Sequence, residues 1–261
     1  MSSTLKSFAG KKIIIIGGTS GIGRAVARRV VDAGGTVVVT GRTQAGADQA
    51  AEDLSAGGGK VFGVGADLCD RAAVDGLCRI LTEEHGDAVG LVNSAGVFSP
   101  KAFLLHTSED FDAYHAINFG LFFVTQAVTR NMIATGVQGA VVNVGSMWAL
   151  QAVAATPSSA YSMAKAGIHA LTQHLAMELR ADGIRVGAVA PAIVRTPIYR
   201  SFVPEAEVDA ALAEFNGFHP IGRIGEPDDV ACVIEFLLSD QAAWVTGVVW
   251  PVDGGVMAGR N

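Results

Sequence analysis

A tyrosine and a lysine stand four residues apart in the stretch Tyr161-Ser162-Met163-Ala164-Lys165. That spacing places both side chains on one face of a helix. A phenol with its ordinary pKa of about 10 is a weak base at neutral pH, and a cation one helical turn away should lower that pKa. The pair is a candidate general acid and base. Tyrosine and lysine at this spacing are also common on solvated helices, so other residues must decide between the two interpretations.

Glycines form a second pattern near the N-terminus, directly after the β-branched run 13–16 and before a stretch with helical spacing. A backbone without Cβ atoms lets a pyrophosphate approach, and a helix N-terminus offers free N–H groups and a positive dipole end. In this context the pattern predicts a dinucleotide site rather than an ordinary turn. Its residues are Gly17, Thr19, Ser20, Gly21, Ile22 and Gly23.

The end of the next apolar run indicates which dinucleotide is bound. An NAD enzyme usually carries an acidic residue there for the ribose 2′-hydroxyl, but this chain has Gly41 followed by Arg42. A guanidinium matches a 2′-phosphate with paired donors, and Thr19, Ser20 and Thr43 could add hydroxyl groups. NADP is therefore predicted over NAD, with a solvated surface arginine as the alternative.

Short apolar runs alternate with stretches of helical spacing along the whole chain. Continuous apolar strands are typical of a parallel sheet that is buried on both faces. The alternation predicts one α/β domain over 1–261, a Rossmann-type doubly wound parallel sheet of about seven strands with helices on both faces. The expected strands are 13–16, 37–40, 61–64, 91–92, 141–144, 186–189 and 245–249, and the expected helices are 24–33, 45–54, 71–84, 109–134, 160–180 and 228–238.

One long irregular segment, 197–225, interrupts this alternation. A connection of this length is predicted to be a substrate lid, since ligands bind beyond the carboxyl ends of the strands in such sheets. A small helical subdomain is the alternative.

Composition excludes several classes of protein. The 261 residues are 50% apolar and carry 19 basic against 25 acidic side chains, a net charge of −6. This is neither a disordered chain nor one with the basic face that nucleic acid requires. No apolar run approaches the roughly 20 residues of a membrane span, and residues 1–12 lack the apolar core of a targeting signal. Three cysteines match no zinc spacing and the histidines form no ligand set, so no metal and a cytoplasmic location are predicted.

Taken in order, the motifs from about Ala9 to about Gly255 resemble the short-chain dehydrogenase/reductase family, in particular its 3-oxoacyl-reductase-like members. The motifs that match are Asp67-Leu68, Asn93-Ser94-Ala95-Gly96, Ile117-Asn118, Ser146, Tyr161 with Lys165, Pro191-Ala192, Thr196-Pro197, 222–227 and 252–255. Four features depart from the family pattern: Ile16, Ser94, Ala192, and a Ser146-to-Tyr161 spacing longer by about two residues. We expect the added length, within 148–159, to form a bulged loop over the substrate cleft.

The resemblance implies a role for each catalytic residue. Tyr161 exchanges a proton with the substrate oxygen, which Ser146 holds by a hydrogen bond. Lys165 lowers the pKa of Tyr161 and binds the nicotinamide ribose, and Asn118 orders a water that links Lys165 to solvent. The residues implied to contact the cofactor, beyond the glycine turn, Arg42, Tyr161 and Lys165, are Asp67, Leu68, Asn93, Ala95, Gly96, Val194 and Thr196.

These expectations add up to an NADP(H)-dependent oxidoreductase that interconverts a ketone and a secondary alcohol. The cleft is expected to be mostly apolar, which favours a neutral small-molecule substrate; its expected wall is Phe98, Met147, Trp148, Leu150, Phe202 and Phe215. The resemblance also implies a homotetramer or homodimer. Two alternatives stay open, an NAD-dependent alcohol or sugar dehydrogenase and a non-catalytic NADP(H)-binding sensor.

Overall fold

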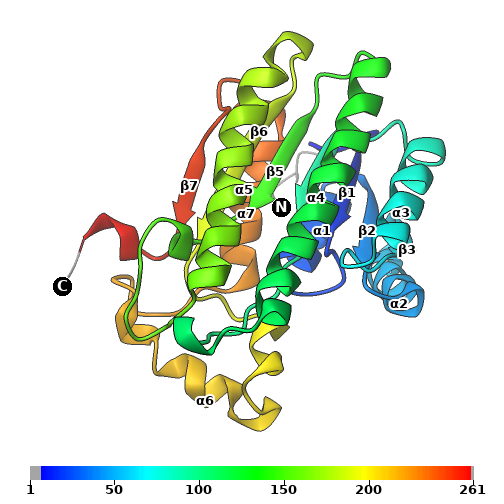
Figure 1. The fold of residues 1–261 in the computed structure, drawn as a ribbon. Helices are drawn as coiled ribbons and strands as arrows, with labels where there is room; N and C mark the ends of the chain where they lie inside the picture. The colour runs from blue at the N-terminus through cyan, green and yellow to red at the C-terminus, as the bar shows by residue number, and fades with distance from the viewer. Residues whose placement is uncertain (1–6, 260–261) are drawn as a thin grey trace.

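The computed structural model describes residues 7–259, so residues 1–6, part of the segment predicted to lack a targeting signal, lie outside it. Seven parallel strands form one sheet in the order β3-β2-β1-β4-β5-β6-β7 (Figure 1). The described strands are β1 Lys12–Ile16, β2 Thr36–Gly41, β3 Lys60–Gly65, β4 Gly90–Asn93, β5 Ala140–Val144, β6 Arg185–Pro191 and β7 Val249–Val252. The predicted doubly wound parallel sheet is confirmed.

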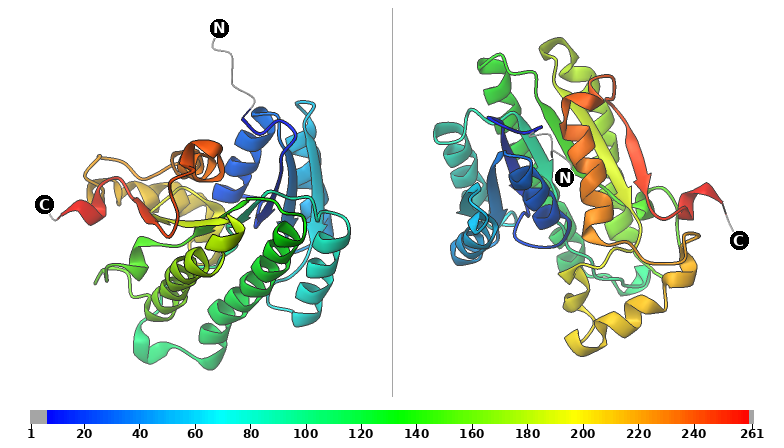
Figure 2. Two further views of the ribbon diagram at one scale, coloured as in Figure 1. Left: turned by 90° about the horizontal axis from the view of Figure 1, so that it is seen from above. Right: turned by 180° about the vertical axis from the view of Figure 1, so that it is seen from behind.

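Helices cover both faces of the sheet (Figure 2). Alternating side chains of β1 explain the two layers, because Ile13 and Ile15 belong to the core on the side of α1, α2 and α7, whereas Ile14 and Ile16 belong to the core beneath α3, α4 and α5. The α-helices in the described chain are α1 Gly21–Asp32, α2 Gln44–Ser55, α3 Arg71–Glu83, α4 Ser108–Ala134, α5 Ser159–Glu178, α6 Val208–Ala213 and α7 Pro227–Leu238. Within residues 7–259, no helix combines the length and apolar character needed to span a membrane.

Strand order reverses between β1 and β4, which pair in register from Ile13 with Gly90 to Ile16 with Asn93. Chain connections leave β1 and β4 in opposite directions there, which opens a crevice beyond the carboxyl ends of the strands. The irregular segment 197–225 lies at this end of the sheet and contains α6 and several short 3₁₀ turns (Figure 1).

The last strand lies later in the chain than predicted. The sequence predicted 245–249, whereas β7 is Val249–Val252 and pairs with the end of β6. Gly247 has φ +69°, a left-handed conformation that breaks an extended strand. The prediction from valine content therefore placed the start of this strand at Val245, whereas it begins at Val249.

Candidate active site

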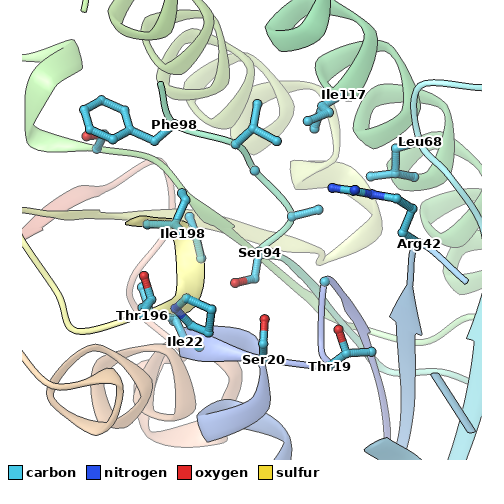
Figure 3. Close-up of a pocket in the computed structure, with 18 of the residues that line it drawn as sticks. Thr19, Ser20, Ile22, Arg42, Leu68, Ser94, Phe98, Ile117, Thr196 and Ile198 are labelled. Carbon is cyan, nitrogen blue, oxygen red and sulfur yellow. The ribbon is translucent and has the colours of Figure 1, made fainter. Parts of the chain in front are cut away.

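A cavity of about 690 Å³ lies at the crevice between β1 and β4. Its walls come from the glycine turn, the loops that follow β2, β3, β4, β5 and β6, and the N-terminal parts of α4 and α5. Figure 3 shows side chains from these segments facing one another across the cavity. Residues far apart in the sequence thus meet at the carboxyl ends of the parallel strands, as the fold requires.

Ser146, Tyr161 and Lys165 all line this cavity. Ser146 follows β5 in extended conformation and is 3% exposed. Its Oγ accepts a hydrogen bond from the backbone N–H of Trp148 at 3.2 Å. On α5, Lys165 donates from Nζ to the carbonyl oxygen of Val144, at the end of β5, at 2.8 Å. Helix and strand therefore hold the predicted trio on one wall.

Burial shifts the pKa values of the tyrosine and the lysine. The pKa of Tyr161 is raised to about 12, because burial disfavours the phenolate more than a hydrogen bond with Ser146 favours it. The pKa of Lys165 is lowered to about 8 by burial of the ammonium. We expected Lys165 to lower the pKa of Tyr161. The structure differs because the lysine Nζ bonds to Val144 and lies 5.9 Å from the centre of the tyrosine ring.

Glycines let the backbone of the turn pack closely against the segment after β4 and against α1. Gly17 and Gly21 have φ of +79° and +52°, which favour glycine. A Cβ on Gly17 would lie 2.7 Å from the backbone nitrogen of Ala95, and one on Gly23 would lie 2.3 Å from the carbonyl oxygen of Gly17. The first residues of α1 line the cavity, and Ser20, which caps the helix, makes no side-chain capping bond, so this N-terminus can serve as an anion site. The cradle fits a pyrophosphate.

Arg42 reaches over the cavity from the end of β2, beside Leu68 (Figure 3). Gly41 precedes it, and a Cβ at Gly41 would lie 2.6 Å from Cγ2 of Thr19. An acidic side chain at this position, as would bind a ribose 2′-hydroxyl, would therefore require the Thr19 side chain to move. What remains is a guanidinium with paired donors, which fits a 2′-phosphate.

The cavity brings most of the predicted site residues together. Those on its wall are Gly17, Thr19, Ser20, Gly21, Ile22, Arg42, Asp67, Leu68, Ala95, Gly96, Ser146, Tyr161, Lys165, Val194 and Thr196. Gly23, Asn93 and Asn118 lie off it. Gly23 packs against the carbonyl group of Gly17. The Asn118 side chain donates from Nδ2 to the carbonyl oxygen of Ala164 at 2.9 Å. Asn118 thus ties α4 to the helix turn before Lys165.

Asn93 belongs to a buried chain of polar side chains behind the site. Its Nδ2 donates to Oγ1 of Thr125 and to Oδ1 of Asn143, both at 2.8 Å. Asn143 in turn donates from Nδ2 to Oγ1 of Thr172 at 2.8 Å. This polar chain, Thr125–Asn93–Asn143–Thr172, joins α4, β4, β5 and α5 with side chains that are all nearly inaccessible to solvent. Asn93 therefore fixes the strands that carry the site.

Aromatic and aliphatic side chains form the wall nearest Tyr161. The ring of Phe98 lies 4.8 Å from that of Tyr161 and 6.2 Å from that of Trp148, measured between centroids. Tyr199 also lines the cavity, and burial raises the pKa of its phenol. Among the six expected wall residues, Phe98 and Trp148 line the cavity. The other four do not. Met147 and Phe215 pack in a hydrophobic cluster with Leu212 and Ile224, and Leu150 and Phe202 are exposed.

Two further expectations concern the loops, the position of 148–159 and the backbone at Ala192. Within 148–159 only Trp148 lines the cavity, and Pro157 instead accepts a hydrogen bond from the backbone N–H of Lys101. Ala192 takes a backbone conformation compatible with its Cβ, because positive φ is confined to glycines in the described chain. Tyr199 was missed, since the irregular segment around it has no periodicity. No cluster of metal-ligating side chains occurs among the residues that the structure describes.

The chain is similar to known proteins over nearly its whole length. A family model described as enoyl-(acyl carrier protein) reductase matches residues 17–257. The cis-4-hydroxycyclohexanecarboxylate dehydrogenase of Sinomonas cyclohexanicum is 38% identical over 97% of this chain and 99% of that protein. A short-chain type dehydrogenase/reductase from Mycobacterium marinum superposes with a TM-score of 0.89 at 28% identity over 98% of both chains. A protein from Beutenbergia cavernae, assigned as an NAD(P)-dependent gluconate 5-dehydrogenase and solved with NADP at low occupancy, gives 0.88 at 31% identity over 98% of this chain and 100% of its own.

Proposed function

The chain belongs to the short-chain dehydrogenase/reductase family, a family of oxidoreductases acting on alcohol and carbonyl groups, and from this we propose that it is an NADP(H)-dependent enzyme that interconverts a ketone and a secondary alcohol. One observation carries the proposal. Ser146, Tyr161 and Lys165 line the same cavity as the glycine turn and Arg42. A proton-transferring group and a dinucleotide cradle therefore face one space. A non-catalytic sensor has no need of the first.

Tyr161 is the proposed general acid and base. In reduction its hydroxyl gives a proton to the substrate oxygen, and in oxidation its phenolate takes that proton back. Ser146 holds the same oxygen by a hydrogen bond from Oγ. Lys165 lies one helical turn from Tyr161 and supplies the positive charge that supports the phenolate when it forms. When bound, the nicotinamide supplies or accepts the hydride.

The residues proposed to hold the cofactor divide by the part of it they suit. The glycine turn and the start of α1 suit the pyrophosphate, Arg42 suits a 2′-phosphate, and Asp67 with Leu68 suits the adenine. Lys165 suits the nicotinamide ribose, and Val194 with Thr196 suits the carboxamide. Among residues 7–259, the wall near Tyr161 carries no charged side chain other than Lys165, which supports a neutral, partly hydrophobic substrate.

Further proposals concern the molecule around the site. Segment 197–225 is proposed as a lid on a single domain, because Ile198 and Tyr199 line the cavity and Ser201 donates from Oγ to the carbonyl oxygen of Phe98. The three cysteines are unpaired, as in the reducing cytoplasm proposed as its location. Exposed apolar side chains on α4 and α5, such as Phe122 and Met163, support assembly into a homotetramer or homodimer.

The direct test is a binding and turnover assay. The dissociation constants of NADPH and NADH are measured by calorimetry, and consumption of each is then followed with a panel of ketones, aldoses and 3-oxoacyl thioesters. Tighter binding of NADPH together with ketone reduction supports the proposal. Preference for NADH with an alcohol or sugar indicates the dehydrogenase alternative, and tight NADPH binding without turnover across the panel indicates the sensor.

Arg42→Ala should weaken NADPH binding about 10–100-fold while NADH binding changes little. The variant removes a paired, charge-assisted contact that only the 2′-phosphate makes. Calorimetry with both nucleotides measures the difference. Arg79→Ala, on the exposed side of α3 away from the cavity, is the matched control and should change neither. Equal weakening of NADPH and NADH would argue against a 2′-phosphate contact.

The two directions of reaction should respond differently to pH. Oxidation needs the phenolate of Tyr161, whose fraction rises about tenfold per pH unit below a pKa of about 12. Its rate should therefore rise from pH 6 to about 8 and rise less steeply above that, where Lys165, with a pKa of about 8, loses its charge. Reduction needs the neutral phenol and should show no such rise. Initial rates at saturating cofactor measure both, and a parallel rise in the two directions would contradict this assignment.

A further inference from the structure

His169 is a buried polar side chain that the mechanism above leaves unused. It follows Lys165 by four residues on α5, so Tyr161, Lys165 and His169 lie on one face of the helix. The residue is 6% exposed. Its Nε2 lies 3.3 Å from the backbone nitrogen of Ser146 and accepts the hydrogen bond from that N–H. The imidazole thus contacts the residue proposed to hold the substrate oxygen.

The acceptor role fixes the state of the ring. Because an N–H donates to Nε2, that nitrogen carries no proton, and the neutral ring has its proton on Nδ1. Burial and the nearby charge of Lys165 lower the pKa of His169 to about 4, so the ring is neutral at physiological pH. Nδ1 has no hydrogen-bonding partner among the described residues. A polar ring with one unpaired nitrogen is a costly choice for mere packing.

Gly145 makes the contact sterically feasible. A Cβ at this position would lie 2.0 Å from Nε2 of His169 and 2.5 Å from its Cδ2. Any other residue would push the ring away from the Ser146 amide. The glycine before the serine and the histidine on the helix are therefore complementary, although they stand 24 residues apart (169 − 145).

This contact is one of three between α5 and the end of β5. Thr172 bonds Asn143, His169 bonds Ser146, and Lys165 bonds Val144. The other two hold the strand, whereas the histidine holds the backbone of the residue beyond the strand end, where the chain turns into a short 3₁₀ turn. Ser146 is also held through its Oγ, which accepts from the N–H of Trp148, and through its carbonyl oxygen, which accepts from the N–H of Ala149; the histidine is the partner of its own backbone N–H.

We propose that His169 is a positioning residue, which fixes Ser146 for catalysis by accepting the hydrogen bond from its backbone N–H. The inference rests on the proposed function, since it assumes that Ser146 holds the substrate oxygen. A displacement of about 1 Å in such a group can cost as much as 100-fold in rate. The effect should appear in kcat, because His169 does not line the cavity.

The test compares full-length variants by steady-state kinetics and thermal melting. His169→Leu should lower kcat about 10–100-fold with the KM for NADPH changed less than about twofold. His169→Gln, whose amide oxygen can accept the same bond, should recover most of kcat. His174→Leu, exposed on the same helix, is the matched control and should match the parent. Recovery by glutamine distinguishes hydrogen bonding from simple filling of space.

A double variant tests whether the histidine acts through the serine. Adding His169→Leu to Ser146→Ala should lower kcat by less than about twofold more, because the group being positioned is already gone. Losses that multiply, or a His169→Leu variant with parental kcat beside an impaired Ser146→Ala, would overturn the inference and leave the proposed function standing. A Ser146→Ala variant with parental kcat would overturn both the role of Ser146 and this inference.

Discussion

Tyr161→Phe should lower kcat in both directions by about 10²–10⁴-fold. The substitution removes only the hydroxyl that exchanges a proton with the substrate oxygen. The ring stays, and with it the edge-on contacts to Phe98 and Tyr114 at 4.8 and 5.9 Å between centroids. NADPH affinity should therefore stay within a few-fold of the parent. Steady-state rates and calorimetric titration of the same preparation measure both quantities.

Tyr114→Phe is the matched control, because it also removes a phenolic hydroxyl, from the tyrosine whose ring packs next to that of Tyr161. The Tyr114 hydroxyl donates to the carbonyl oxygen of Ser99 at 3.0 Å and accepts from its N–H at 3.1 Å, and Tyr114 does not line the cavity. This variant should lose about 1 kcal/mol of stability and keep its activity. Retention of more than about a tenth of kcat by Tyr161→Phe would mean that another group moves the proton.

Lys165→Met should change activity and stability in opposite directions. The variant loses the charge beside Tyr161 and should lose about 10²–10³-fold in kcat/KM. It should also unfold at a higher temperature at pH 7. Burial lowers the lysine pKa from 10.5 to about 8, so the folded protein holds an ammonium in an unfavourable place. Removing it should stabilise the protein by roughly 1–3 kcal/mol, after loss of the bond to Val144 is deducted.

The stability difference should depend on pH with a definite sign. Between pH 8 and 10.5 the unfolded lysine still binds a proton that the folded one has released, so the parent gains stability as pH rises. The advantage of Lys165→Met is then full below pH 8 and gone above 10.5. Chemical denaturation across this range measures it, with the exposed Lys60→Met as control. A variant less stable than the parent at pH 7 would show that the ammonium is not held at a cost.

Sequence was sufficient where local pattern and chain order carry the information. The apolar runs without polar alternation predicted parallel strands, and β1, β2, β5 and β6 lie where they were expected. The glycine turn was predicted for the same reason, because glycines such as Gly17 directly after a strand are typical of a turn whose backbone approaches a pyrophosphate. Most of the motif residues reach one cavity since they all follow strands of a parallel sheet.

Properties that depend on three-dimensional surroundings were not predictable in this way. The pKa of Tyr161 was expected to fall, but its direction is set by burial depth, which no spacing reveals. Asn93 was expected on the cavity, but a strand-end amide faces whichever partner is near, here Thr125 and Asn143. Tyr199 lies in a segment without periodicity. His169 was not singled out from the sequence either: it stands four residues after Lys165, but no spacing reveals its partner, Ser146 beyond the end of β5.

The polar chain Thr125–Asn93–Asn143–Thr172 restricts how this protein can change over generations. Each asparagine in it forms hydrogen bonds with its neighbours in the chain. Replacing one member by an apolar residue therefore leaves a buried polar group of its neighbour without a hydrogen-bonding partner, at a cost of about 1–3 kcal/mol. We therefore expect most single apolar substitutions at these four positions to lower the free energy of unfolding. Loss of the polar chain during evolution would require either a less stable intermediate or two simultaneous substitutions. Substitutions at the four positions should therefore be coupled, so that they are tolerated together more readily than one at a time.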